Sequence, residues 1–259
     1  MECVINRRMN VLVGVMLHLL KRVKMIKVII NETICDESIN ISLKRKLHVI
    51  QIEVDEVAVR AKEMIDVILD TSWISKLDLI NQISYEARAK RTIDKLVREI
   101  FEKITDDVTE EFGEYLISLS AQDALEVLYS HKTIPLAELF KEKVIGNPGF
   151  DFHTESSDQI ICFGEAKYSE NVSRYSDALE QIIEFIGLGK DASELADLRN
   201  FVSENAINNA TANKRGYVAA FSINAKNPST IIHNALNSDY ISSLSDCNEL
   251  YLIGVVIKC

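Results

Sequence analysis

The second half of this sequence alternates strand-like apolar runs with segments of helical periodicity, and this order restricts the fold more than any other feature. The apolar runs cover residues 134–144, 150–154, 159–168, 216–223 and 250–258. Helical patterns cover residues 109–129 and 173–186, where Gly187 is expected to end the helix, and a short helix is expected to begin at Pro228. The order helix–β–β–β–helix–β–helix–β predicts an α/β fold, with a mixed β-sheet flanked by helices.

Glycine and proline are scarce along the chain, with 9 Gly and 3 Pro among 259 residues. Average proteins carry roughly 12% of these two residue types together. The scarcity therefore favours long helices and strands over a disordered chain, a collagen-like chain or a β-sandwich with many turns. Hydrophobic residues make up 47% of the sequence, which is enough to bury a sizeable core.

The first half predicts an N-terminal α+β extension, residues 1–84, ahead of a main domain, residues 85–259. Residues 48–54 alternate as a strand does, and apolar residues from Val57 to Ile68 recur at helical spacing. A further amphipathic helix is expected from about Tyr85 to Ile104. Residues 1–50 hold nine Lys or Arg and four Asp or Glu, a net charge of +5, so the total of −10 leaves −15 for the rest. We therefore expect the extension to contact a protein partner or DNA.

An apolar run at residues 9–20 follows Arg7 and Arg8, as the apolar part of a signal peptide would. The run has 12 residues, too few to span a bilayer, and basic residues follow it where a signal peptide has a small-residue cleavage site. We expect a buried segment and no membrane association, with a helix on a membrane surface as the alternative. The five cysteines are scattered and never spaced as CxxC, which favours reduced thiols in a cytoplasmic protein over a zinc knuckle.

The residues with the clearest chemical meaning lie on two predicted neighbouring strands, in the runs NPGFDFH (147–153) and IICFGEAK (160–167). Asp151 belongs to the first run, and Glu165 and Lys167 end the second. Since residues i and i+2 of a strand share a face, Glu165 and Lys167 point the same way. A hairpin brings Asp151 beside them, so two carboxylates and one ammonium are expected to converge at a strand end.

This set of groups suits the hydrolysis of a phosphodiester. Mg²⁺ prefers carboxylate oxygens and keeps several waters, and a bound metal polarises the phosphoryl group and lowers the pKa of a water ligand. A neighbouring lysine positions that water or balances the charge that develops on the phosphoryl oxygens. The alternative interpretation is an ordinary ion pair between Glu165 and Lys167 at a solvent-facing strand end.

The sequence GFD followed by ICFGEAK resembles the core of the PD-(D/E)XK phosphodiesterase superfamily, the restriction-endonuclease-like fold, over about residues 109–259. The resemblance implies that Asp151 and Glu165 are metal ligands, that Lys167 is the catalytic lysine and that Mg²⁺ or Mn²⁺ is the cofactor. This chain departs from the literal motif in one place, because Phe150 precedes Asp151 and Pro148 lies two positions earlier.

Many members of that superfamily add a glutamate from the preceding helix. Glu114 is the candidate in this sequence, with Glu110 and Glu138 as substitutes. A solvated acidic face is the alternative for Glu114, because residues 102–126 hold eight acids and one lysine. Three secondary candidates, for each of which a structural role is the alternative, are His153, Gln181 and Tyr168.

Basic side chains that would bring DNA to this acidic chain fall into two groups. They are Arg88, Lys90, Arg91, Lys95 and Arg98 on one predicted helix, and Lys214 and Arg215 further along. A solvated helix face is the alternative explanation. The sequence has no HExxH, P-loop or GxSxG motif, which disfavours a zinc hydrolase, a P-loop ATPase and a serine hydrolase.

Within the superfamily, the run from EFGEYL through GFDFH to GEAKYS is similar to the nuclease subunit of Hachiman-type antiphage systems, which works with a helicase. This resemblance implies a Mg²⁺-dependent deoxyribonuclease that acts as the effector of a prokaryotic defence system, with DNA and a helicase or other ATPase as partners. Two alternatives stay open: a catalytically inactive nuclease fold that binds a partner complex, and a homodimeric endonuclease of the restriction or resolvase type.

Overall fold

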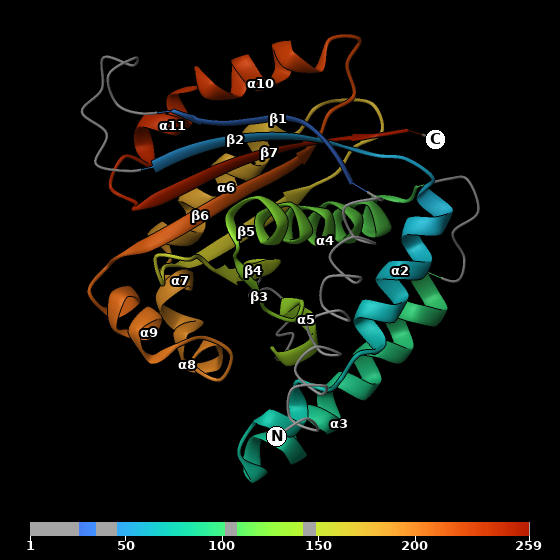
Figure 1. Cartoon of the computed structure of the whole chain (residues 1–259), viewed down its shortest axis with the longest axis vertical. Helices are drawn as coiled ribbons and strands as arrows, with labels where there is room; N and C mark the ends of the chain where they lie inside the picture. Colours follow the sequence, from blue (N-terminus) through green and yellow to red (C-terminus); the bar gives the residue numbers. More distant parts are fainter. Residues whose placement is uncertain (1–25, 35–45, 102–107, 142–148, 259) are drawn as a thin grey trace, which may run out of the picture.

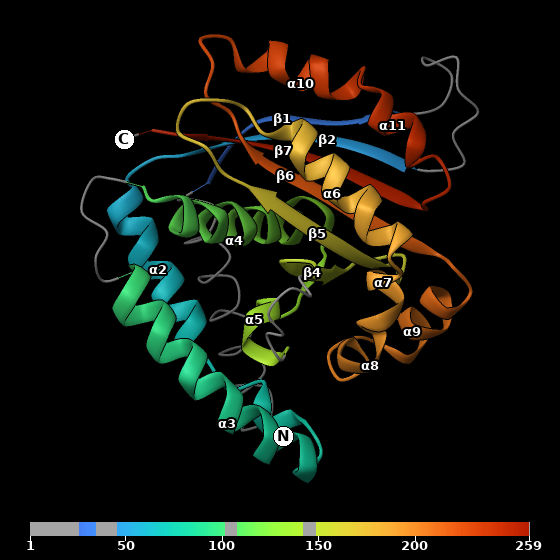
Figure 2. The same ribbon diagram turned by 180° about the vertical axis from the view of Figure 1, so that it is seen from behind.

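A computed structural model describes residues 26–34, 46–101, 108–141 and 149–258, and Figures 1 and 2 show it from opposite sides. These residues form a seven-stranded mixed sheet with helices on both faces, which confirms the predicted α/β class. The strands are β1 (Ile26–Ile34), β2 (Lys46–Val54), β3 (Lys132–Thr133), β4 (Phe152–Glu155), β5 (Ile161–Lys167), β6 (Arg215–Ser222) and β7 (Glu249–Ile257). The apolar run at residues 9–20 lies outside the described residues.

The strand order across the sheet is β1-β2-β7-β6-β5-β4-β3. The four central strands β2, β7, β6 and β5 are parallel, and β1, β4 and β3 join at the edges in antiparallel pairs. Parallel strands are covered on both faces and therefore read as continuous apolar runs. The first seven residues of β7 are all buried, which explains why the sequence 250–258 was recognisable as a strand.

Ten α-helices surround the described part of this sheet. They are α2 (Val57–Leu69), α3 (Leu79–Lys95), α4 (Glu110–Tyr129), α5 (Ala137–Phe140), α6 (Tyr175–Gly187), α7 (Lys190–Ser193), α8 (Leu195–Leu198), α9 (Glu204–Thr211), α10 (Pro228–Leu236) and α11 (Asp239–Ser243). Helix α4 crosses one face of the sheet and α6 the other (Figures 1 and 2). Every helix among the described residues is too short or too polar to span a lipid bilayer.

The strand predicted at residues 134–144 is wrong. Only Lys132–Thr133 pair with β4, and the helix α5 follows after a short turn. The N–H of Ile134 still donates to the carbonyl of His153 at 3.3 Å, but Pro135 has no N–H to continue the ladder. Pairing therefore stops there, and the end of the predicted strand, residues 142–144, lies outside the described residues.

The start of one helix differs from the prediction, and the predicted end of another is confirmed. Helix α3 begins at Leu79, six residues before the expected start, because Asp78 accepts hydrogen bonds from the N–H groups of Ile80 and Asn81. Leu79 and Ile80 in its first turn are exposed, so the sequence there lacks the periodic buried residues by which the rest of the helix was predicted. Helix α6 does end at Gly187, but the left-handed backbone lies at Gly189, with φ 67°.

The described part of the N-terminal region is continuous with the main sheet. Strand β2 pairs with β7 over its whole length, from Lys46 opposite Glu249 to Val54 opposite Ile257. The expected boundary between residues 84 and 85 falls within α3. The role of residues 1–84 in contacting a partner or DNA stays a prediction.

Candidate active site

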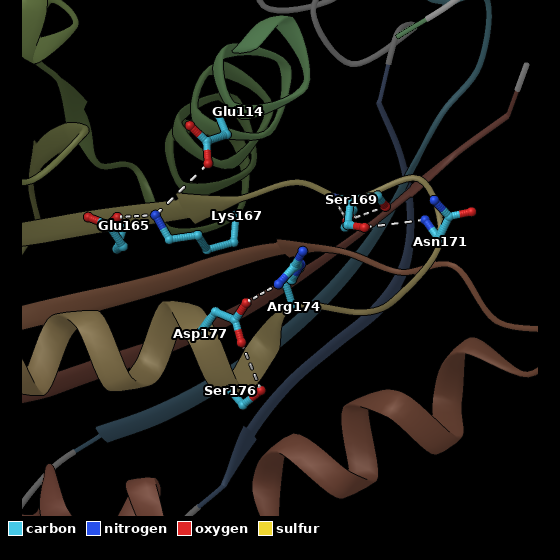
Figure 3. A network of polar contacts seen from close by, with 9 residues as sticks. Glu114, Glu165, Lys167, Ser169, Asn171, Arg174, Ser176 and Asp177 are labelled. Atoms are coloured by element: carbon cyan, nitrogen blue, oxygen red, sulfur yellow. Dashed lines mark hydrogen bonds and ion pairs between the residues drawn. The ribbon is translucent and has the colours of Figure 1, made fainter. Parts of the chain in front are cut away.

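Glu165 and Lys167 lie together at the carboxyl end of β5. The Nζ of Lys167 donates a hydrogen bond to Oε1 of Glu165 at 2.7 Å, as expected for residues two apart on one strand face. Glu165 is 1% exposed, and its second oxygen, Oε2, is buried with no hydrogen-bond partner among the described residues. Figure 3 shows the Lys167 side chain reaching from β5 toward two carboxylates.

Asp151 is held beside this pair by the β4–β5 hairpin. Its N–H donates to the carbonyl of Gly164 at 2.9 Å, one residue ahead of the point where β4 begins. Its side-chain Oδ2 accepts a hydrogen bond from the N–H of Ala166 at 2.9 Å, between Glu165 and Lys167. The structure therefore brings together the three residues that the sequence singled out, and Asp151 keeps its other oxygen, Oδ1, outside the described hydrogen bonds.

Glu114 approaches the same cluster from α4. Thr109 caps this helix by accepting a hydrogen bond from the N–H of Phe112 at 3.3 Å, which sets its first turn. A side chain at Gly113 would lie 2.2 Å from the ring of Tyr168, so glycine lets the helix sit against the end of β5. The Oε1 of Glu114 then lies 3.9 Å from the Nζ of Lys167 (Figure 3).

The electrostatics of the cluster favour a bound cation. Burial, together with the charge of Asp151, raises the pKa of Glu165 well above its usual range. Burial also raises the pKa of Asp151 and raises that of Glu114 to about 7. For Lys167, burial alone would lower the pKa, but the three carboxylates outweigh it and the pKa is raised. The raised pKa values mean that these carboxyl groups tend to hold protons, because three ionised carboxylates beside one ammonium would leave two negative charges uncompensated. A divalent cation that displaced the protons would balance those charges.

The donor set fits a hard cation such as Mg²⁺, because the free donor atoms are carboxylate oxygens, above all the orphaned Glu165 Oε2. Among the described residues, the one set of three His, Cys, Asp or Glu ligand atoms within 4.8 Å of one another is His131, Cys162 and Glu249. The ligand atoms of Asp151, Glu165 and Glu114 are thus more widely spread. Asp151, Glu165 and Glu114 are the carboxylates of this cluster that could hold such a cation.

A small pocket adjoins Asp151, with a volume of about 110 Å³ and mostly acidic walls. Its lining is Glu111, Glu114, Tyr115, Ser118, Glu138 and Asp151. Of the two substitutes considered for Glu114, Glu138 lines this pocket and accepts a hydrogen bond from the Tyr115 hydroxyl. Glu110 is exposed at the first residue of α4 and is not part of the pocket lining.

The secondary candidates occupy positions with other partners. His153 is fully buried, and its Nε2 lies 2.7 Å from Oε2 of Glu194; burial lowers its pKa to about 4. The Tyr168 ring packs on Gly113. Gln181 is half-buried on α6, and no described contact joins it to Glu165 or Lys167.

The expected DNA-contact residues divide into exposed and engaged side chains. Those exposed are Lys90, Arg91, Lys95, Arg98 and Lys214, of which Lys95 lies 3.7 Å from the Glu111 carboxylate. Arg88 donates to the carbonyl of Phe140 at 3.4 Å and lies over the ring of Tyr85. Arg215 donates to the buried carboxylate of Asp191 and to the carbonyl of Ala210 at 3.2 Å. The engaged guanidinium groups stabilise the fold, and the exposed cations are the ones available to phosphates.

Two residues next to the cluster, Lys141 and Glu194, did not emerge from the sequence. Both contact the backbone of Phe150, directly before Asp151. Glu194 lies in a helical segment 43 residues after Asp151 in the numbering, with no pattern that connects the two. The one local signal is Gly149, whose missing side chain leaves the space that the Glu194 carboxylate fills.

Comparison with known proteins identifies the family of the chain. The family model of HamA matches residues 27–255, which include every residue of the cluster. No curated protein matches the chain. Because the family match extends over far more than half of the sequence, the chain belongs to the HamA family, a component of the Hachiman antiphage defence system.

Proposed function

We propose that this HamA-family chain is a metal-dependent nuclease that hydrolyses DNA phosphodiester bonds and acts as the effector of its defence system. The observation that carries the proposal is the joining of Asp151, Glu165 and Lys167 at the end of β5. Glu165 and Lys167 come from β5, and Asp151 directly precedes β4, so two buried, mutually repelling carboxylates lie beside an ammonium. Perturbed ionisable groups of this kind are concentrated at catalytic sites.

Mg²⁺ or Mn²⁺, when bound, would polarise a phosphodiester and lower the pKa of a coordinated water. Asp151 Oδ1 and Glu165 Oε2 are the oxygens that would hold the cation, since their partner oxygens are already hydrogen-bonded to Ala166 N and Lys167 Nζ. These two hydrogen bonds orient the carboxylates before the cation arrives. Metal binding would also remove the cost of burying Glu165 Oε2 without a partner.

Lys167 is the group that would act on the reacting phosphate. Its ammonium is held by Glu165 at 2.7 Å and is 21% exposed, so it remains charged and accessible from the site. A compact ammonium at this position can orient the attacking water and balance charge on the phosphoryl oxygens. Glu114, 3.9 Å from the same Nζ, would keep Lys167 in place and contact the cation through water.

A helicase or other ATPase partner fits the charge of the chain. The net charge of −10 opposes a phosphate backbone, and the exposed cations Lys90, Arg91, Lys95, Arg98 and Lys214 offset it only locally. A partner that unwinds and delivers DNA would supply the attraction that this surface lacks. A nuclease that needs this partner to bind DNA would also stay inactive in the absence of an invading genome.

The test is incubation of the purified chain with plasmid and with single-stranded DNA, in Mg²⁺ or in EDTA, alone and with its helicase partner. We expect cleavage of DNA in Mg²⁺ with the partner present and no cleavage in EDTA. Absence of cleavage under every condition, with the partner still bound, would favour the inactive binding subunit.

A further inference from the structure

Glu194 forms a buried polar cluster next to the candidate active site. It lies between α7 and α8, and its side chain is 8% exposed. Its Oε1 accepts hydrogen bonds from Lys141 Nζ at 2.6 Å and from the Phe150 N–H at 3.1 Å. Its Oε2 accepts from Nε2 of His153 at 2.7 Å. Three polar groups from two segments of the chain, Lys141 and residues 150–153, thus meet at one carboxylate.

This cluster holds both backbone polar groups of Phe150, the residue before Asp151. Glu194 accepts from the Phe150 N–H, and Lys141 Nζ donates to the Phe150 carbonyl at 3.0 Å. A side chain at Gly149 would lie 2.2 Å from Glu194 Oε1 and 3.2 Å from Lys141 Nζ. The backbone ahead of Asp151 is therefore fixed by side chains from outside the hairpin.

The ordering extends through the Asp151 backbone. Its N–H donates to Gly164, and its carbonyl accepts from the N–H of Ala137 at 3.3 Å. The peptide between Phe150 and Asp151 is thus held on both sides. The direction of the Asp151 carboxylate depends on that backbone, since the side chain adds two torsions to it.

His153 Nδ1 has no partner among the described residues, so the hydrogen-bond geometry assigns a neutral ring that donates from Nε2 to Glu194.

We propose that Glu194, together with Lys141, positions Asp151 for cation binding, as a pair of positioning residues that never touch the substrate. The inference rests on the proposed function, because it gives Asp151 the role of a metal ligand. A buried ion pair is a suitable device for this purpose: breaking one partner leaves an uncompensated charge, so the arrangement has a single low-energy geometry.

A matched control lies on the same helical segment. Asp191, on α7, is also a buried carboxylate that accepts from a cation and a neighbour, Arg215 and the Tyr217 hydroxyl at 2.7 Å. Its partners belong to β6, and it makes no described contact with Phe150. Asp191→Asn therefore breaks a comparable buried pair without touching the backbone before Asp151.

The experiment compares wild type, Glu194→Gln and Asp191→Asn in three measurements on the full chain. These are Mn²⁺ affinity by calorimetry, the Mg²⁺ concentration that half-saturates DNA cleavage with the helicase partner, and the melting temperature. Gly149→Ala serves as a second variant, because its methyl group displaces the Glu194 carboxylate while both charges remain.

We expect Glu194→Gln and Gly149→Ala to weaken Mn²⁺ binding by roughly 10-fold or more and to raise the half-saturating Mg²⁺ concentration in parallel. Asp191→Asn should lower the melting temperature and leave both metal values unchanged. Equal Mn²⁺ affinities in Glu194→Gln, Gly149→Ala and Asp191→Asn would overturn the positioning role. Failure of the wild type to bind Mn²⁺ or cleave DNA would instead overturn the proposed function.

Discussion

The Nζ of Lys167 lies 2.7 Å from Oε1 of Glu165, and the second oxygen of that glutamate is buried with no hydrogen bond from the described residues. One oxygen of the carboxylate is thus committed to the lysine, and the other has its full capacity to bind a cation. The ion pair that would be the ordinary explanation of an E-x-K triplet leaves a costly orphan in this protein. The proposed metal site would account for both oxygens.

Lys167→Ala should abolish cleavage while leaving the fold and metal binding largely intact. The ammonium serves the transition state more than the ground state, so its loss should lower the rate by roughly 10²-fold or more. Lys167→Arg should not restore activity, because a broad guanidinium cannot replace a compact ammonium beside the attacking water. Mg²⁺ titrations of DNA cleavage and thermal melts check both variants; substantial activity in Lys167→Arg would contradict this role.

Asp151→Ala should act on metal binding first. It removes the candidate ligand oxygen and also the acceptor for the N–H of Ala166. Asp151→Asn keeps that acceptor, so it should melt close to wild type and still lose metal affinity. Calorimetry with Mn²⁺ measures the effect directly. Wild-type affinity in Asp151→Asn would remove this residue from the ligand set.

Glu114 should make the stability of the metal-free protein depend on pH. Burial raises its pKa from 4.5 to about 7, so between these values the folded protein holds a proton that the unfolded chain has lost. The unfolding free energy therefore falls as pH rises through this window. Buried histidines such as His131, whose pKa is lowered to about 4, make the unfolding free energy rise with pH instead. Their contribution is the same in wild type and in a Glu114 variant, so it cancels in the comparison.

Glu114→Gln removes the contribution of the Glu114 carboxyl group to the pH dependence of stability. Its melting temperature in EDTA should fall less than that of wild type between about pH 5 and pH 8, the range that brackets the raised pKa. Added Mg²⁺ should stabilise wild type most at the upper end, where the carboxylates are ionised. Identical pH slopes in the two proteins would show that Glu114 titrates normally.

The elements that could be predicted from the sequence are those whose side chains are uniformly buried. Strands β6 and β7 are buried on both faces and read as apolar runs. Strand β1 was missed because it lies at the edge with most of its side chains exposed or half-buried, and α9 because its eight residues are mainly polar. The strand predicted at residues 134–144 failed at Pro135, where backbone chemistry overrides the apolar pattern.

The residues of the candidate site that could be predicted are those close to one another in the sequence. Glu165 and Lys167 follow from the two-residue period of a strand, and Asp151 from the hairpin that pairs β4 with β5. Glu114 depended on how α4 crosses the sheet, for which Gly113 was the available hint. Lys141 and Glu194 reach Phe150 only through tertiary packing, so neither periodicity nor a motif points to them.

Gly113→Ala should test the close approach that brings α4 to the cluster. Its methyl group would overlap the Tyr168 ring, and overpacking of this kind costs about 1–3 kcal/mol. Gly187→Ala, at the end of α6 with nothing within 4 Å, is the matched control and should be neutral or slightly stabilising. Chemical denaturation measures both. Equal stability of the two variants would mean that α4 does not depend on this close approach.

The exposed cations of the α3 region should contribute to DNA binding by neutralising phosphates. Replacing Lys90, Arg91, Lys95 and Arg98 by alanine should weaken binding and lower the salt-dependence slope by roughly 0.9 for each phosphate that is no longer neutralised. Lys62→Ala, which removes an exposed cation on α2, is the control. Binding isotherms at several salt concentrations give the slopes. An unchanged slope in the fourfold variant would exclude this face from the DNA path.

The most direct test of the account is the rate of Mg²⁺-dependent DNA cleavage by the chain with its helicase partner, measured side by side for wild type, Asp151→Ala and Lys167→Ala. Wild type should cleave DNA, EDTA should abolish that cleavage, and each variant should lose roughly 10²-fold or more in rate with the fold retained. Wild-type rates in both variants would contradict the assignment of the active site to the end of β5.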